Sequence, residues 1–308
     1  MSAPEDNFPP IDSPGDLPAE GGQSADESLR PSSQQVPAAE AQAGVPEDLR
    51  TPWAWGCLAL FIAFAVGSLV SLEMVFEVYA LAKLHLNWVE LQKLATSSAL
   101  FIGARQAVWF GGLMLYLYLM VRLRHHAPFW RTIGWRPLPP HALSGGFRYA
   151  TCIAGGVGLA FANMVANKWI PTKGTPPIEK LFHDRQGALV IMTLAILAAP
   201  LVEETVFRGY IYPVLARSFG VPAGVFATGV LFGLIHAEQL RGAWGQLALL
   251  MIVGIVFTFA RARTGTVLAS YLLHLSYNST LCIGFYFGTE GLRHFPDAFW
   301  TFCCVLTA

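Results

Sequence analysis

The sequence predicts an all-α protein, a multi-pass transmembrane helical bundle of seven or eight spans that follows a disordered N-terminal tail. Of the 308 residues, 54% are hydrophobic and only 13% are charged, whereas soluble globular chains carry about 25% charged residues. The apolar residues form stretches of about 20, the length that crosses a bilayer as one helix. The charges are also divided, with ten acidic residues and two arginines in residues 1–50 and eighteen basic against ten acidic residues in the remainder.

Residues 1–50 are rich in Pro, Ser, Ala, Gln and acidic residues, and contain no apolar run. Because such a segment cannot bury enough apolar surface to offset its chain entropy, we expect it to be disordered. It also lacks the basic start and short apolar core of a cleavable signal peptide, so we expect the first span to direct insertion. The remaining residues, 51–308, form the predicted transmembrane domain, which has the lipid bilayer as partner and no nucleic acid.

Eight apolar segments are candidate spans, of which the last is short. They lie near 53–82, 96–121, 146–167, 187–216, 221–237, 244–262, 265–288 and 295–308. The fourth segment is too long for one perpendicular crossing at about 1.5 Å per residue, so we expect it to tilt or to continue past the membrane surface. The five cysteines lie scattered without CxxC spacing and predict neither a disulfide nor a zinc framework.

The loop between the second and third spans contains five arginines and no acidic residue, and the positive-inside rule assigns such a loop to the cytoplasm. These arginines are Arg122, Arg124, Arg131, Arg136 and Arg148. Alternation of the spans then places the N-terminal tail, Arg217 and the Arg261/Arg263 turn on the same cytoplasmic side. All strongly basic loops therefore lie on the predicted cytoplasmic side of the membrane.

The fourth span contains charged residues that need a reason, since a charge at mid-bilayer costs about 2.5–3.5 kcal/mol on insertion scales. Glu203 and Glu204 are adjacent, so they point about 100° apart on a helix and cannot do the same job. Glu204 and Arg208 have the i,i+4 spacing of an intrahelical ion pair. Glu203 is left as a candidate general base in a dry pocket, or as the partner of a distant arginine such as Arg105.

The first two spans also contain charged residues. Glu73 and Glu77 lie one turn apart in the first span, and Arg105 lies in the second. Neutralisation of Arg105 by one of these glutamates is the expected explanation, and a proton or substrate path is the alternative.

Two later spans contain polar residues one helical turn from a partner. Phe232 and His236 lie in the fifth span, and His274 and Asn278 lie in the seventh. A neutral imidazole can move protons or bind a metal, and an amide can donate to a developing oxyanion. The alternative is a structural role, in which these side chains join helices through hydrogen bonds. Together with Glu203 they supply the groups that hydrolysis of a peptide by water requires.

The segments EETVFR, FGLIH and HLSYN resemble the three ordered motifs EExxxR, FxxxH and HxxxN/D of the CPBP intramembrane protease family, the CAAX prenyl protease and bacteriocin-processing group. The resemblance covers about residues 187–290, which would be the catalytic core. It implies that Glu203 activates water, that His236 and His274 bind or polarise it, and that Asn278 stabilises the oxyanion. Glu204, Arg208 and Phe232 would be supporting residues.

The resemblance implies a glutamate-dependent or metallo-endopeptidase in a bacterial cell membrane, with a protein substrate that enters from the membrane or the cytoplasmic face. Glu203, His236 and His274 form a candidate ligand set for zinc, although the same residues could hold water without a metal. The substrate could be a prenylated protein, a bacteriocin-like protein or a protein with a C-terminal sorting tail. Two other functions stay open, a non-catalytic membrane scaffold or immunity protein and, on weaker grounds, a proton-coupled transporter.

Overall fold

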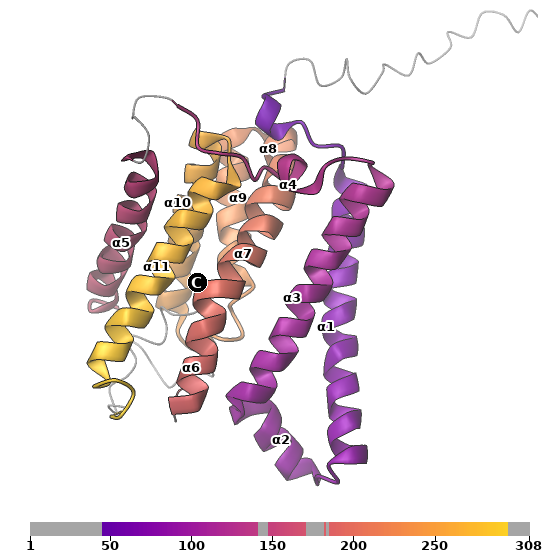
Figure 1. Cartoon of the computed structure of the whole chain (residues 1–308), viewed down its shortest axis with the longest axis vertical. Helices are drawn as coiled ribbons and strands as arrows, with labels where there is room; N and C mark the ends of the chain where they lie inside the picture. The colour runs from indigo at the N-terminus through magenta and orange to yellow at the C-terminus, as the bar shows by residue number, and fades with distance from the viewer. Residues whose placement is uncertain (1–44, 141–146, 171–181, 183–184, 295–308) are drawn as a thin grey trace, which may run out of the picture. The chain divides into compact units, whose positions relative to one another are not determined.

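A computed structural model describes residues 45–140, 147–170, 182 and 185–294. All regular structure in these residues is helical, which confirms the all-α class and the helical membrane bundle. The α-helices are α1 (Trp55–Lys83), α2 (Trp88–Ser97), α3 (Ala99–Leu119), α4 (Phe129–Ile133), α5 (Phe147–Asn167), α6 (Arg185–Thr193), α7 (Ala199–Glu204), α8 (Tyr212–Phe219), α9 (Val221–Leu234), α10 (Trp244–Thr264) and α11 (Val267–Gly288) (Figure 1).

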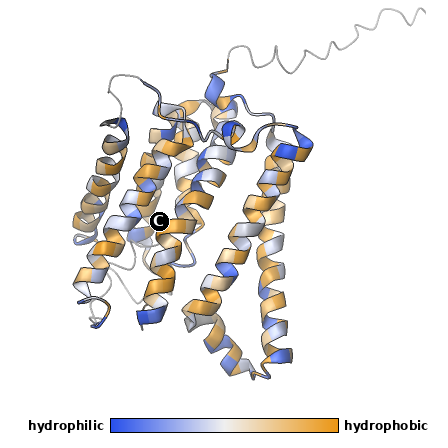
Figure 2. Ribbon diagram, in the orientation of Figure 1, coloured by the Kyte–Doolittle hydropathy of each residue, from blue (hydrophilic) through white to orange (hydrophobic). Residues whose placement is uncertain are grey.

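Five continuous helical stretches in the described residues are long and apolar enough to cross a membrane, and Figure 2 shows the many hydrophobic residues along the long helices. They are Trp55–Lys83, Ala99–Arg124, Arg148–Asn167, Arg185–Phe219 and Trp244–Thr264. Helix α9 is apolar but has only 14 residues, and α11, which carries the third motif, is not among the five. The predicted span at 295–308 lies outside the described residues. The number of spans therefore stays a prediction.

The fourth stretch is one helical run of 35 residues that contains two π-helical turns. The first turn, η6 (Leu194–Ala198), separates α6 from α7, and the second, η7 (Thr205–Ile211), separates α7 from α8. The N–H of Ala199 bonds to the carbonyl of Leu194, and Pro200 has no N–H to donate. The carbonyl of Ala195 is thereby freed from the helical ladder, and π-turns of this kind occur often at functional sites.

Small residues let the helices that carry the three motifs pack closely. Gly254 of α10 faces Gly229 of α9, and a Cβ atom added at Gly254 would lie 2.6 Å from the Gly229 carbonyl oxygen and 2.9 Å from a ring carbon of Phe232. Gly156 of α5 similarly lies against the backbone of Leu273 in α11. Association of membrane helices depends on such close backbone contacts. Helices α9, α10 and α11 consequently form a tight group beside the Glu203 helix.

The segments that the sequence assigns to the cytoplasm meet at one end of the bundle, where α4 and α8 lie (Figure 1). Thr266, just before α11, donates a hydrogen bond to the carbonyl of Arg136 at 2.6 Å. At the end of α10, the buried Arg261 pairs with Asp48 at 2.8 Å. Four segments far apart in the sequence, around residues 48, 136, 217 and 261, are thus held together as the charge pattern predicts.

Residues 45–50, which belong to the predicted tail, are held against the end of the bundle. Residues 45–53 form a strap on the bundle end that includes a short 3₁₀ turn, η3 (Glu47–Leu49). Trp53 is almost fully buried, stacks on Tyr210 at 4.9 Å and donates its indole N–H to the Tyr210 carbonyl at 3.0 Å. Arg217 donates to the carbonyls of Thr51 and Trp53 at 2.9 and 2.6 Å. The composition of residues 1–50 does not predict these contacts, because Asp48 is one of ten acidic residues in that segment.

Two of the three intramembrane charges of the first two spans, Arg105 and Glu73, neutralise each other. Arg105 of α3 forms an ion pair with Glu73 of α1, which confirms the expected explanation for Arg105. Since Arg105 is paired with Glu73, it is not the distant partner considered for Glu203.

Candidate active site

Glu204, at the end of α7, is fully buried and forms the predicted i,i+4 ion pair with Arg208, whose Nη1 lies 2.8 Å from Glu204 Oε1. Arg208 is held on two further sides by α10. Its Nε donates to Thr258 Oγ1 at 3.1 Å, and its Nη2 donates to the Gly254 carbonyl at 2.7 Å. A buried ion pair needs such additional hydrogen bonds because both partners have lost their water.

His274 of α11 links the two glutamates. Its Nδ1 lies 2.9 Å from Glu204 Oε1. Because the carboxylate paired with Arg208 can only accept, Nδ1 is the donor of this hydrogen bond, and Nε2 is the ring nitrogen that faces Glu203. That Nε2 lies 3.9 Å from Glu203 Oε2. Among the described residues, neither of these two buried atoms has a hydrogen-bond partner.

Glu203 Oε2 and His274 Nε2 face each other across a gap that no described side chain fills. The separation of 3.9 Å between Glu203 Oε2 and His274 Nε2 is too long for a direct hydrogen bond. It suits one water molecule, whose two O–H groups can donate to both atoms and whose lone pairs then point elsewhere. The arrangement can therefore hold and activate a nucleophilic water.

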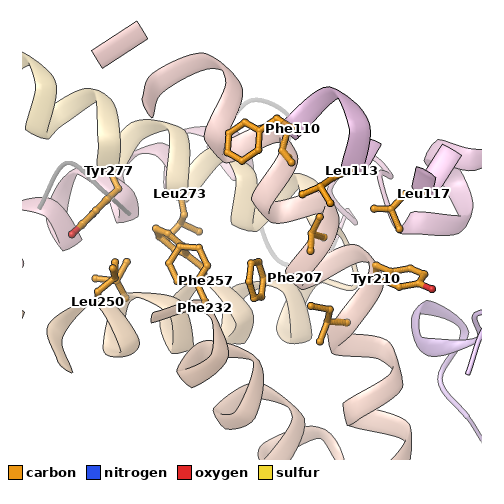
Figure 3. Packing of buried hydrophobic residues seen from close by; sticks show 14 of the residues in the cluster. Phe110, Leu113, Leu117, Phe207, Tyr210, Phe232, Leu250, Phe257, Leu273 and Tyr277 are labelled. Carbon is orange, nitrogen blue, oxygen red and sulfur yellow. The ribbon is translucent and has the colours of Figure 1, made fainter. Parts of the chain in front are cut away.

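His236 lies just beyond the end of α9 and is only 4% exposed, so it does not face lipid. Its Nδ1 donates to the Phe232 carbonyl at 2.8 Å, which leaves Nε2 as the acceptor. The Phe232 ring contacts both imidazoles, with centroid distances of 5.2 Å to His236 and 5.8 Å to His274. The Arg208 guanidinium lies 4.4 Å from the same ring. Phe232 thus contacts residues of all three motifs, and Figure 3 shows its ring among those of Phe207 and Phe257.

Asn278, one turn after His274, is fully buried and turned toward the Glu203 helix. Its Nδ2 donates to the Ala195 carbonyl at 2.8 Å, which is the carbonyl freed by Pro200 and the first π-turn. One amide N–H is thereby used on the backbone. The amide oxygen Oδ1 has no partner among the described residues.

Helix α10 contributes residues that the sequence analysis missed. Phe257 is fully buried and stacks on His274, with ring centroids 4.8 Å apart and planes 26° from parallel. Thr258 and Gly254 hold Arg208, as described above. None of the three is charged, so none stood out in an apolar span. The only available signal was a Gly and a Thr four residues apart on a helix next to the motifs.

The described residues contain no group of three His, Cys, Asp or Glu side chains that could hold a metal ion. Glu203 and His274 face each other, but His236 does not complete a ligand set with them. Zinc therefore stays a prediction, and no step below passes through a metal.

Comparison with known proteins gives a family match over the segment that contains the motifs. Residues 185–280, which contain all three motifs, match the model of a family described as type II CAAX prenyl endopeptidase Rce1-like. The resemblance to the CPBP family is confirmed over these residues. An Escherichia coli protein described as an uncharacterized 24.3 kDa protein is similar to this chain, with 36% identity over 104 residues. The matched residues make up 32% of this chain and 47% of that protein, so the chain spans about half of that relative's length. No solved structure matches the chain.

Proposed function

We propose that this membrane protein is an intramembrane endopeptidase that hydrolyses a peptide bond with a water activated by Glu203. The observation that supports this proposal most is the pair of facing acceptors, Glu203 Oε2 and His274 Nε2, 3.9 Å apart and without partners among the described residues. A structural clamp would join these atoms to donors, whereas a hydrolytic site leaves them for water. The family described as prenyl endopeptidases, which matches over the same residues, supports the same activity.

In the proposed reaction, Glu203 removes one proton from the water and His274 Nε2 orients the other O–H. The water oxygen bonds to the carbonyl carbon of the substrate, and the carbonyl oxygen becomes an oxyanion. Asn278 donates its second amide N–H to that oxyanion, and His236 helps to polarise the water. The C–N bond then breaks, and the leaving amine takes the proton held by Glu203.

Glu204 and Arg208 have a supporting role in this mechanism. The Glu204 carboxylate holds the proton of His274 on Nδ1, at 2.9 Å, so that Nε2 stays an acceptor. Arg208 keeps Glu204 ionised and fixed from 2.8 Å. The order of contacts is therefore Arg208 to Glu204, Glu204 to His274, and His274 to the water.

We infer that the substrate enters from the membrane or from the cytoplasmic face. Trp135, on the predicted cytoplasmic loop, donates its indole N–H to Thr205 at 3.1 Å, and Thr205 directly follows Glu204. This contact supports a site within reach of the cytoplasmic surface. The arginine-rich loop supports a cytoplasmic N-terminus, and we assign the protein to the inner membrane of a bacterial cell.

The substrate class is proposed from the family alone. The description of the matching family favours a prenylated protein, and bacteriocin-like proteins and C-terminal sorting tails are the other candidates. One fluorogenic peptide of each class would be incubated with the detergent-purified protein. The peptide that is cleaved would identify the substrate class.

The decisive experiment compares membranes of source cells that produce the wild-type protein, Glu203→Gln or Glu238→Gln. Newly formed protein termini would be quantified by mass spectrometry. Glutamine keeps the shape of Glu203 but cannot accept the proton, so the new termini should vanish in Glu203→Gln. They should persist in Glu238→Gln, because Glu238 is exposed and forms an ion pair with Arg241, three residues away on the surface. Unchanged termini in Glu203→Gln would refute the protease proposal and favour a scaffold or immunity function.

A further inference from the structure

We propose that α10, which carries none of the three motifs, supplies the positioning residues of the site, with Phe257 setting the ring plane of His274 and Thr258 fixing Arg208. This inference rests on the proposed function, since it assigns a task to residues that surround the proposed water. The evidence is that residues of one segment of α10, Gly254 to Thr258, contact two different motif helices. Phe257 stacks on His274, and Gly254 and Thr258 accept hydrogen bonds from Arg208.

Phe257 restrains the imidazole that must face Glu203. The His274 ring turns about its Cβ–Cγ bond, and one hydrogen bond from Nδ1 to Glu204 restrains that rotation at one ring atom only. The flat contact with Phe257, at 4.8 Å and 26°, removes this freedom. Phe257 is itself locked by edge contacts, 5.8 Å to Tyr277 and 6.3 Å to Phe232. Figure 3 shows Phe257 among these aromatic rings, between Leu273 and Phe232.

Thr258 restrains Arg208, which is linked to His274 through Glu204. Its hydroxyl donates to the Gly254 carbonyl at 2.7 Å and accepts from Arg208 Nε at 3.1 Å. The same Gly254 carbonyl accepts from Arg208 Nη2 at 2.7 Å. Arg208 is therefore held in one orientation by two atoms of α10, and it presents Nη1 to Glu204. Movement of Arg208 would move Glu204, and with it the proton on His274.

Gly254 brings the backbone of α10 close to α9. A Cβ atom there would meet both the Gly229 carbonyl and the Phe232 ring. Glycine lets α10 approach α9 closely enough for its carbonyl to reach the guanidinium of Arg208. Gly254, Phe257 and Thr258 thus act as one unit on His274 and Arg208.

The test measures catalysis and imidazole geometry separately. Wild type, Phe257→Leu and the matched control Phe285→Leu would be compared, since Phe285 is an equally buried α11 residue that packs on Phe182 away from the site. Phe257→Leu should lower kcat by about 10- to 100-fold with little change in KM, because a small misplacement of a reacting group costs that much. The ¹⁵N NMR spectrum of the labelled His274 imidazole should change from one Nδ1–H form to a mixture. Phe285→Leu should alter neither quantity.

A second pair of variants keeps the test valid where Phe257→Leu fails to fold. Thr258→Val removes the hydroxyl at nearly constant volume, and Thr258→Ser retains it. Valine should reduce kcat and perturb the His274 spectrum, and serine should restore both. Wild-type rates and spectra in Phe257→Leu and Thr258→Val, or equal losses in Thr258→Val and Thr258→Ser, would overturn the proposal. If the wild type cleaves no peptide but the His274 spectrum responds as predicted, the positioning role stands and the protease function fails.

Discussion

The buried ion pair between Glu204 and Arg208 gives a large and measurable stability prediction. In Glu204→Gln the guanidinium of Arg208, which is fully buried, loses its only carboxylate partner at hydrogen-bond distance in the described site. Stranding one member of a buried pair destabilises a protein by about 3–5 kcal/mol. The matched change Glu238→Gln breaks an exposed i,i+3 pair with Arg241, and exposed pairs contribute about 0–1 kcal/mol. Reversible unfolding in mixed detergent and SDS micelles, followed by circular dichroism, measures both.

A double variant tests the cause of this loss. Glu204→Gln combined with Arg208→Met removes both charges, so the double variant should be more stable than the sum of the two single losses predicts. The coupling should be about 0.5–3 kcal/mol, the range for residues in one network. Equal stabilities of Glu204→Gln and Glu238→Gln, or strict additivity in the double variant, would refute the argument that Glu204 and Arg208 form a buried ion pair in which each charge depends on the other.

Two further predictions concern the strap and the helix contact. Asp48→Asn should lower the free energy of unfolding by about 1.5–3 kcal/mol, because the buried Arg261 loses a charged hydrogen-bond partner. The control Glu47→Gln changes an exposed side chain of the strap and should lower the free energy of unfolding by less than about 1 kcal/mol. Equal losses for the two variants in the same unfolding assay would contradict the strap contact. Gly254→Ala should cost about 1–3 kcal/mol through overpacking against α9. Gly112→Ala, where a Cβ atom meets nothing within 4 Å, should stay within about 0.5 kcal/mol of wild type; a neutral Gly254→Ala would refute the close contact.

Local spacing and membrane electrostatics made much of this protein predictable. The Glu204–Arg208 pair depends only on helical periodicity, and the Glu73–Arg105 pair follows from the cost of an isolated charge in the bilayer. The meeting of the basic segments at one end follows from the positive-inside rule. These features need no knowledge of how the helices pack.

The remaining features depend on tertiary packing or on an unusual backbone turn. Asn278 was expected to serve an oxyanion, but one of its N–H groups bonds to Ala195, whose carbonyl is free only because a π-turn precedes Pro200. Pro200 inside an apolar helix was a readable signal for this turn. Phe257 and Thr258 are ordinary residues of an apolar span, and only the packing of α10 on the motif helices gives them partners.

The central claim is that Glu203 and His274 together hold the reacting water, and a high-resolution cryo-electron microscopy structure in a lipid nanodisc tests it most directly. The account predicts one density between Glu203 Oε2 and His274 Nε2, at about 2.6–3.2 Å from each atom. A density at about 2.0–2.2 Å from both would identify a metal ion and contradict hydrolysis without metal. A direct hydrogen bond between Glu203 and His274, with nothing between them, would contradict the claim itself.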